Sequence, residues 1–197
     1  ITSAIYTNEY LAPVIEGFTS QYPDIDIQLS IYPCHVDLIE GRYDLALRHS
    51  ELNDNNYCSK FLAKNNYAIC AAPDYLAKHG TPLTPEELQQ HNALVSMHKG
   101  EKSDEWTLLR DGQARVNTVS GNFTTNNGSF CLDYALRGNG IIRLPQFVIQ
   151  PYIDAGKLVP ILKDYDLPTS KIYLTYPRSK QLSSKVNLLM KFLENWF

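Results

Sequence analysis

The spacing of apolar residues separates helical from extended stretches in the first fifty residues. From Leu11 to Tyr22 the apolar side chains recur at intervals of three and four, which predicts an amphipathic helix. From Ile25 to Ile31 they alternate strictly with polar residues, which predicts a strand. CHVDLIEG then predicts a short helix ending at Gly41, and YDLALR predicts a strand ending at Arg48. This strand–helix–strand order predicts an α/β unit with a mainly parallel sheet.

The patterning continues in the middle of the chain. YAICAAP predicts a strand that runs directly into the short helix of PDYLAKHG. In LTPEELQQHN, Thr84 at the N-cap, Pro85 after it and Glu87 three residues on predict a helix opened by a capping box. Asp111 and Gly112 between two strand-like runs predict a hairpin.

The last third of the chain returns to alternating strands and helices. GNGIIRLP, KLVPIL and KIYLTYP predict strands, and QFVIQPYIDAG predicts a helix closed by Gly156. The apolar positions from Val186 to Trp196 predict a C-terminal helix that starts after Ser183 or Ser184. We therefore expect the middle of the chain, which contains the hairpin, to form a second lobe inserted into the first.

One stretch, TTNNGSFCLDYALRGNG at 124–140, combines a helix signal with a cluster of small polar residues. Asn126 or Asn127 suits the N-cap, and Gly138 suits the left-handed residue that ends a helix. The simpler interpretation is a capped helix. The other interpretation is that the helix start, with its free N–H groups and positive dipole end, faces a bound anion.

Composition excludes several classes of protein. The chain has 197 residues, 44% of them hydrophobic and 20% charged, as in an ordinary globular protein. A net charge of −3 gives no electrostatic basis for nucleic-acid binding by this chain itself. No apolar run is long enough to span a bilayer, and no signal-peptide pattern opens the sequence. The first residue is Ile1, and ITSAIY begins as if partway along a strand, so we expect a fragment of a longer chain.

Catalytic and metal-binding motifs are missing from the sequence. There is no dinucleotide fingerprint, nucleophile elbow or metal-binding helix, and the four cysteines lack the spacing of zinc ligands. Cys34 and His35 are adjacent, but neighbouring side chains usually point apart, which disfavours a catalytic pair. Arg48 is either a surface charge or a clamp for a carboxylate, and Arg143 needs a partner or the edge of a cavity. We therefore predict neither an enzyme, a cofactor nor a metal site.

Several segments together resemble the effector-binding domain of LysR-type transcriptional regulators. They are YLAPVIEGFTSQYPDIDIQLS, VDLIEGRYDLALR, AICAAPDYLAKHGTPLTPEELQQHNALV, RGNGIIRLP and YPRSKQLSSKVNLLMKFL, in that order, and the resemblance covers essentially the whole chain. It implies an α/β fold like type 2 periplasmic binding proteins, with two α/β lobes around a ligand cleft. Lobe I would hold residues 1–70 and 173–197, and the inserted lobe II residues 71–172. The family's N-terminal winged helix-turn-helix is absent from this chain.

The resemblance also implies where an effector would bind, in agreement with the rule that open α/β sheets bind ligands beyond the carboxyl ends of their strands. In this context we favour the anion site at the start of the helix after Asn127. One departure concerns the turn TSAIYT, where many family members place a second hydroxyl and this chain has Ile5. That change predicts a less polar ligand or an altered response. The implied ligand-binding residues are Ser3, Ile5, Pro33, Cys34, Arg48 and His49 in lobe I, and Ser96, Thr125, Asn126, Asn127 and Ile142 in lobe II.

By this resemblance the chain is the ligand-sensing and oligomerisation domain of a bacterial, cytoplasmic regulator. Its partners would be a small, anionic effector, further copies of itself in a homodimer or homotetramer, and DNA only through the missing domain. The family's usual antiparallel dimer would use the 8–21 and 130–137 helices. Two alternatives stay open: a solute-binding receptor of a membrane transport system, which shares the fold, and an enzyme on the same fold.

Overall fold

The computed structural model divides the chain into two compact units, described separately below. Unit 1 comprises Ile1–Asn65 and Ser170–Phe197, and unit 2 comprises Asn66–Thr169. The structure describes residues 1–3, 5, 11–32, 36–49, 51–52, 54–98, 101–178 and 182–197. The expected boundaries after residues 70 and 172 fall a few residues later than these. The first differs because the strand around Ile69 pairs within unit 2.

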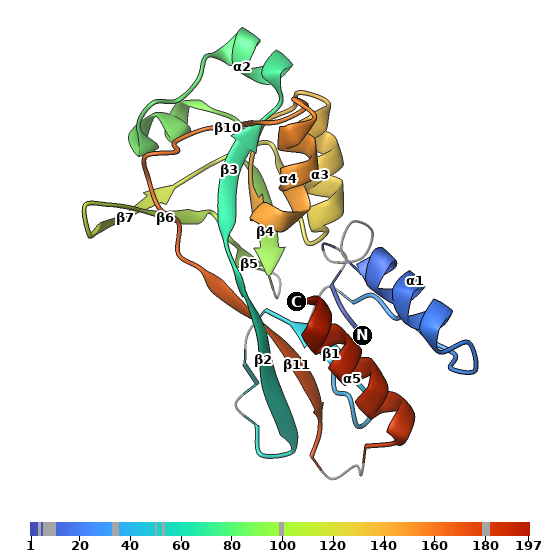
Figure 1. Ribbon diagram of the computed structural model, residues 1–197. Coiled ribbons are helices and arrows are strands. Elements are labelled where there is room, and N and C mark those ends of the chain that lie inside the picture. Colours follow the sequence, from blue (N-terminus) through green and yellow to red (C-terminus); the bar gives the residue numbers. More distant parts are fainter. Residues whose placement is uncertain are drawn as a thin grey trace. The chain divides into compact units, whose positions relative to one another are not determined.

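Unit 1 is built on a three-stranded antiparallel sheet of β1 (Ala46–Arg48), β11 (Ser170–Pro177) and β2 (Tyr57–Asn65), with β11 in the centre. The first residues of the chain extend it. Leu47 N–H donates to the Ile1 carbonyl at 2.9 Å, and Thr2 forms a parallel bridge with Ile31. Residues 1–2 therefore lie between β1 and Ile31, as parallel neighbours of both. Figure 1 shows β2 and β11 as the two long strands of this unit.

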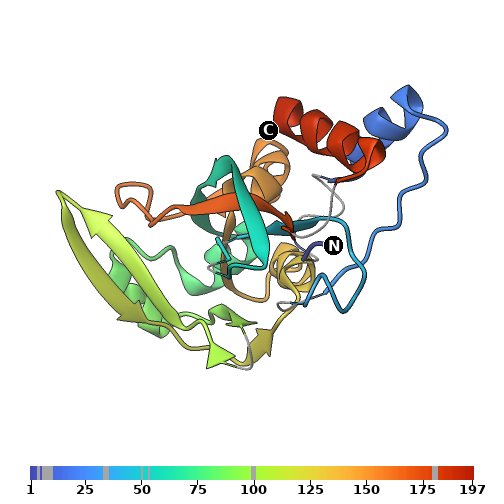
Figure 2. The same cartoon turned by 90° about the horizontal axis from the view of Figure 1, so that it is seen from below.

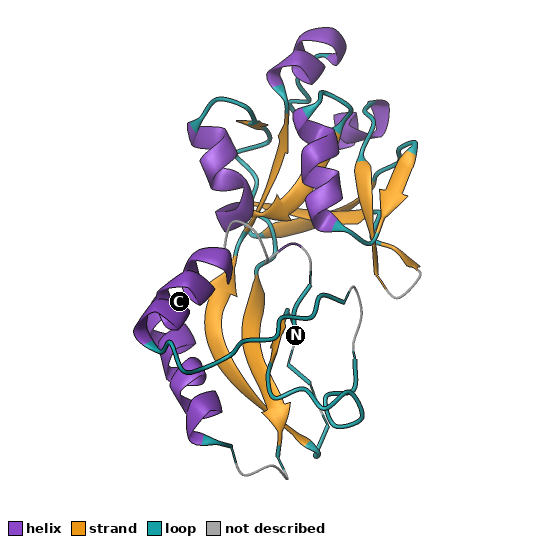
Figure 3. Cartoon of the chain, turned by 90° about the vertical axis from the view of Figure 1, so that its right-hand side faces the viewer, coloured by secondary structure: helices purple, strands orange, loops and turns teal. Residues whose placement is uncertain are grey.

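Two helices, α1 (Ala12–Gln21) and α5 (Ser184–Trp196), pack side by side in unit 1 (Figure 3). Phe18 of α1 is fully buried and meets Phe192 of α5 edge to face, with ring centroids 5.4 Å apart. Ser183 caps α5, because its hydroxyl accepts the Val186 N–H. Both helices were predicted from their apolar spacing, and both are confirmed.

Unit 2 has strands in three groups. β3 (Tyr67–Ala71) pairs antiparallel with β9 (Ile141–Pro145) and with β10 (Val159–Pro160). β4 (Leu94–His98) pairs in parallel with β8 (Phe123–Thr125) and antiparallel with β5 (Glu101–Lys102). β6 (Glu105–Arg110) and β7 (Gln113–Thr118) form a hairpin, seen as a long ribbon in Figure 2. A parallel bridge between Ala93 and Ile141 joins the first two groups.

The helices of unit 2 are α2 (Pro73–His79), the 3-10 helix η3 (Pro85–Gln90), α3 (Gly128–Leu136) and α4 (Gln146–Asp154). The largest buried side chain of the core is Trp106, which packs with Leu108, Ile69 and Ile141. The predicted hairpin turn is confirmed, because Asp111 and Gly112 both adopt the positive φ that it requires (52° and 76°).

Three predictions about local structure are wrong. The stretch Ile25–Ile31 is not a continuous strand, since only Ile31 forms a bridge there among the described residues. The predicted parallel arrangement holds for residues 1–2, Ile31 and β1, whereas β11 and β3 each run antiparallel to both of their neighbours. The part of CHVDLIEG that the structure describes forms turns instead of a helix, and the Asp37 carboxylate accepts the Ile39 and Glu40 N–H groups there. At η3 the Thr84 hydroxyl contacts the Glu87 carboxylate at 3.5 Å instead of capping the helix.

Candidate ligand-binding site

The parallel segments of unit 1 end together at one edge of its sheet. Because residues 1–2 run parallel to both Ile31 and β1, the residues that follow each segment emerge on the same side. Ser3 and His49 are two of these, and Ser3 Oγ lies 3.3 Å from His49 Nε2. Both side chains are half-buried. The structure thus joins two of the predicted ligand-binding residues, which lie 46 positions apart in the sequence.

Arg48 is not placed as a clamp that awaits a carboxylate. The residue is only 8% exposed, and its Nη2 donates to the Val36 carbonyl at 2.7 Å. Burial lowers the pKa of Arg48, while the charges of Tyr57 and Asp37 oppose that shift. We therefore assign Arg48 a positioning role, since it holds the backbone at Val36. The predicted residues Pro33 and Cys34 lie outside the described part of the chain.

A second hydrogen-bonded group stands beside Arg48. The Tyr57 hydroxyl donates to the Asp37 carboxylate at 2.8 Å, across 20 positions of sequence. The Glu40 N–H, followed by the Tyr57 hydroxyl, lowers the pKa of Asp37, so this carboxylate is ionised at neutral pH. The Asp37 carboxylate therefore bonds both to the backbone of the turn that follows it and to the Tyr57 side chain.

Tyr32 was not among the single residues predicted to bind a ligand, although the turn YPCH that it opens was expected at the site. It directly follows Ile31 at the same sheet edge, is 43% exposed, and accepts a hydrogen bond from the Tyr43 hydroxyl at 3.2 Å. The signal was present in the sequence, because Tyr32 stands between the end of an alternating stretch and Pro33. That Tyr43 is the hydrogen-bond partner of Tyr32 could be learned only from the fold, because the two residues are eleven positions apart.

Unit 2 has a corresponding edge, where β4 and β8 run in parallel. Their register pairs Ser96 with Thr125, so these two predicted residues are neighbours at the carboxyl ends of their strands. The Thr125 hydroxyl accepts the Asn127 N–H at 3.1 Å and orders the turn into α3. Ser96, Thr125 and Asn127 therefore lie near one another at this edge.

Asn127, rather than Asn126, is the N-cap of α3. Its Oδ1 accepts the Ser129 N–H at 3.1 Å and the Phe130 N–H at 3.2 Å. These two first-turn groups are thus used within the chain and are not offered to an anion. Because Oδ1 is engaged, the amide Nδ2 of Asn127 is the atom that can donate to a ligand.

The remaining predicted residues differ in exposure. Ile142 is only 1% exposed and belongs to the core of unit 2, whereas Asn126 is exposed and Ile5 is half-buried. Arg143, which needed a partner, is flanked by two aromatic rings. Its Cζ lies 5.8 Å from the ring centroid of Tyr67 and 5.7 Å from that of Trp106.

The chemistry of these groups suits binding. Hydroxyl, imidazole and amide groups donate and accept hydrogen bonds to a small polar molecule without reacting with it. The described residues form no cluster of three or more His, Cys, Asp or Glu side chains that would hold a metal ion. Among the described helices, none combines the length and the apolar character needed to cross a bilayer.

Comparison with known proteins gives one consistent family. The LysR substrate binding domain family matches residues 2–197. The HTH-type transcriptional activator TtdR of Escherichia coli K12 is 28% identical over 191 residues, covering 97% of this chain and 61% of that protein. The HTH-type transcriptional regulator CrgA of Neisseria meningitidis serogroup B is 33% identical over 184 residues, covering 93% and 61%. The chain thus spans about three fifths of the length of these relatives.

The fold has a solved counterpart. The regulatory domain of CrgA from Neisseria meningitidis superposes with a TM-score of 0.90 at 30% identity, covering 98% of this chain and 95% of that domain. This match confirms the predicted fold class, an α/β fold of the type 2 periplasmic-binding-protein kind. These curated relatives are named as regulators, in agreement with the prediction that the chain is not an enzyme.

Proposed function

The chain belongs to the LysR substrate-binding domain family, and on that premise we propose that it senses a small, carboxylate-bearing effector for a LysR-type transcriptional regulator. The observation that carries the proposal is the family match, which runs over residues 2–197 without a break. DNA would be bound by a separate N-terminal domain, as in the relatives named for such a motif. The chain's own charge of −3 agrees with that division of labour.

The proposed effector-binding residues come from both units. In unit 1 they are Ser3 and His49, supported by their mutual hydrogen bond, together with the expected Ile5, Pro33 and Cys34. In unit 2 they are Ser96, Thr125, Asn126 and Asn127, supported by the parallel register of β4 and β8. Arg48 and Ile142, both buried, would act by supporting these residues.

The amide of Asn127 favours an acceptor on the effector. Its Nδ2 donates, and the Ser3 and Thr125 hydroxyls can also donate, so carboxylate oxygens are suitable partners. The positive end of the α3 dipole adds a further preference for negative charge. Ile5, in place of a hydroxyl residue, would suit an effector with an apolar part.

Signalling would follow from a difference in affinity. An effector shifts the balance between two arrangements of the domain only by as much as it binds one better than the other. In a cytoplasmic homodimer or homotetramer that shift would alter how the DNA-binding domains are presented. Exposed apolar side chains support association through α3 and the 25–31 stretch: Leu29 is 40% exposed, Ile31 50% and Phe130 50%.

A ligand screen by thermal denaturation tests the proposal. The melting temperature of the chain is measured against small carboxylates, amino acids, sugars and aromatic acids. A ligand at one hundred times its dissociation constant adds about 2.7 kcal/mol to the free energy of unfolding. A carboxylate that raises the melting temperature, and whose neutral amide does not, supports the proposal. A panel without any stabilising carboxylate would contradict it.

A further inference from the structure

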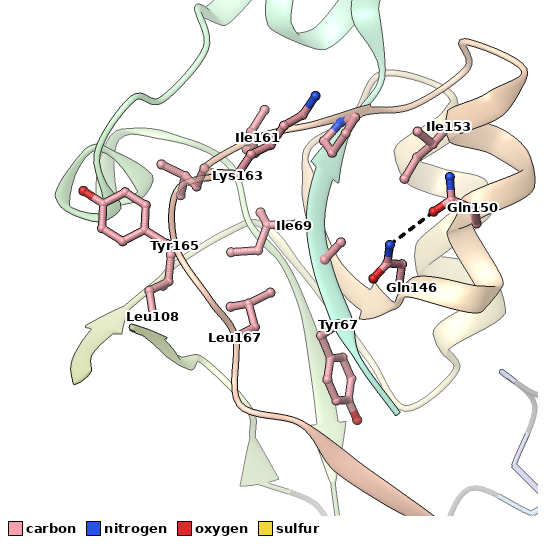
Figure 4. A pocket seen from close by; sticks show the side chains of 13 residues that line it. Tyr67, Ile69, Leu108, Gln146, Gln150, Ile153, Ile161, Lys163, Tyr165 and Leu167 are labelled. Atoms are coloured by element: carbon pink, nitrogen blue, oxygen red, sulfur yellow. Dashed lines mark hydrogen bonds between the residues drawn. The ribbon is translucent and has the colours of Figure 1, made fainter. Parts of the chain in front are cut away.

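Unit 2 contains a pocket that none of the predicted effector residues lines. It has a volume of about 290 Å³ and lies between β3, α4 and the chain segment 160–167, which we call the strap. Figure 4 shows Leu108, Tyr165 and Leu167 on one side of β3, and Gln146, Gln150 and Ile153 of α4 on the other. All of its lining belongs to unit 2.

The strap is held by backbone hydrogen bonds near both of its ends. The Ile161 N–H donates to the Ile69 carbonyl at 3.0 Å, which continues the pairing of β10 with β3. The Asp166 N–H donates to the Leu109 carbonyl at 2.8 Å on the hairpin side. Between these anchors the chain turns at Leu162, whose φ of 52° is unfavourable for a branched side chain. Such strain persists only where the surrounding contacts impose it.

The lining exposes polar and apolar surface in similar amounts. The half-buried Tyr67, Tyr165 and Leu167 supply apolar surface, and the Gln146 amide donates to Gln150 Oε1 at 3.3 Å at one margin. An apolar cavity of about 150 Å³ holds one benzene ring. A volume about twice that size accommodates about a dozen non-hydrogen atoms.

The charges at the pocket are positive. Lys163 is the one charged side chain among the described residues that line it. Two guanidinium groups contact tyrosines that line the pocket. Arg110 donates to the Tyr165 hydroxyl at 3.4 Å, and Arg143 Cζ lies 5.8 Å from the Tyr67 ring centroid. Asp164 and Asp166 belong to the strap but do not line the pocket. The balance favours an anionic end on an otherwise apolar ligand.

We propose that this pocket is a second small-molecule site, which takes an amphipathic monocarboxylate with its chain or ring against Tyr67, Tyr165 and Leu167 and its carboxylate beside Lys163. The site is independent of the proposed effector residues. A regulator with such a site would respond to two ligands, each stabilising the unit that it binds.

Methyl NMR on the 197-residue chain tests the proposal, with octanoate and para-ethylbenzoate as probes and labelled isoleucine as reporter. We expect saturable shifts at Ile69, Ile153 and Ile161, which line the pocket, and none at Ile172 in unit 1. Ligands of about ten atoms at ordinary efficiency bind with dissociation constants on the order of 1 mM. The neutral para-ethylbenzamide should bind at least about fivefold more weakly than para-ethylbenzoate, because it lacks the charge.

A charge-reversal pair isolates the role of Lys163. Both Lys163 and Lys157 are exposed, so neither substitution should perturb folding, but only Lys163 lines the pocket. Lys163→Glu should weaken binding by about tenfold, and Lys157→Glu by less than about twofold. The proposal is overturned if neither carboxylate shifts the pocket isoleucines up to about 20 mM. It is equally overturned if Lys163→Glu binds as the unsubstituted chain does.

Discussion

The side-chain oxygen of Asn127 lies 3.1 Å from the backbone nitrogen of Ser129, so the residue expected to face a ligand also holds its own helix. The same oxygen accepts the Phe130 N–H. A capping role and a ligand-binding role therefore use different atoms of one side chain, Oδ1 for the helix and Nδ2 for the ligand. This division makes the two roles separable by substitution.

The cap predicts how stability responds at position 127. Asn127→Ala should lower the free energy of unfolding by about 1 kcal/mol, because two first-turn N–H groups lose their partner. Asn127→Asp keeps an oxygen there, and its charge suits the helix start, so stability should be nearly unchanged. Urea unfolding measures both. The exposed Asn126→Ala is the matched control, and an equal loss there would contradict the assignment of the cap.

Arg48 should prove to be structurally important. Arg48→Met removes a buried hydrogen bond to the Val36 carbonyl and should cost about 1–3 kcal/mol in the free energy of unfolding. Arg178→Met, at an exposed side chain of the same unit, should cost less than about 0.5 kcal/mol. Denaturant unfolding compares the two variants. Equal stabilities would show that Arg48 does not hold this turn.

Acid should destabilise the chain partly through His91. Its ring lies 3.3 Å from the Tyr75 hydroxyl, and burial, followed by the charge of His79, lowers the pKa of His91. Because the folded pKa is below the unfolded value of about 6.5, the unfolded chain binds more protons, and stability falls as the pH drops through that value. His91→Gln keeps a polar partner for Tyr75 but does not titrate. Its melting temperature should fall less between about pH 8 and pH 5.5 than that of the unsubstituted chain.

If the melting temperature of His91→Gln falls as much as that of the unsubstituted chain, or more, the acid sensitivity belongs to other groups.

The cysteines should differ in reactivity. Burial raises the pKa of Cys70 to about 12 and that of Cys131 to about 11, whereas Cys58 is partly exposed. In a Cys34→Ala background, iodoacetamide at about pH 8 should modify Cys58 first and reach Cys70 and Cys131 only after unfolding. Peptide mass spectrometry reads the order. Early modification of Cys70 would show that β3 opens in the folded chain.

The sequence predicted those elements whose signals are local. The helix from Ala12 to Gln21 follows from apolar spacing, and the hairpin at Asp111 follows from two residues that accept positive φ. At the candidate site, the hydroxyl and amide residues around Thr125 were implied by the family resemblance, and the helix cap at Asn126 or Asn127 followed from the local sequence.

Features set by distant partners could not be predicted. The alternating stretch from Ile25 to Ile31 shows which side chains share a face, but not whether a strand lies alongside; only Ile31 forms a bridge there among the described residues. The strand β2 was missed, since YCSKFLAKN lacks alternation and pairs with β11, more than one hundred positions away. The burial of Arg48 likewise depends on Val36, Asp37 and Tyr57 meeting around it.

The most direct test of the proposed function is the affinity of the stabilising carboxylate for two variants, one in each unit. Isothermal titration calorimetry compares the unsubstituted chain with Ser3→Ala and with Asn127→Asp, which preserves the cap. Each variant should bind at least about tenfold more weakly, since each loses a donor and the second adds a repelling charge. Unchanged affinity in both variants, with their stability intact, would contradict an effector site built from these residues.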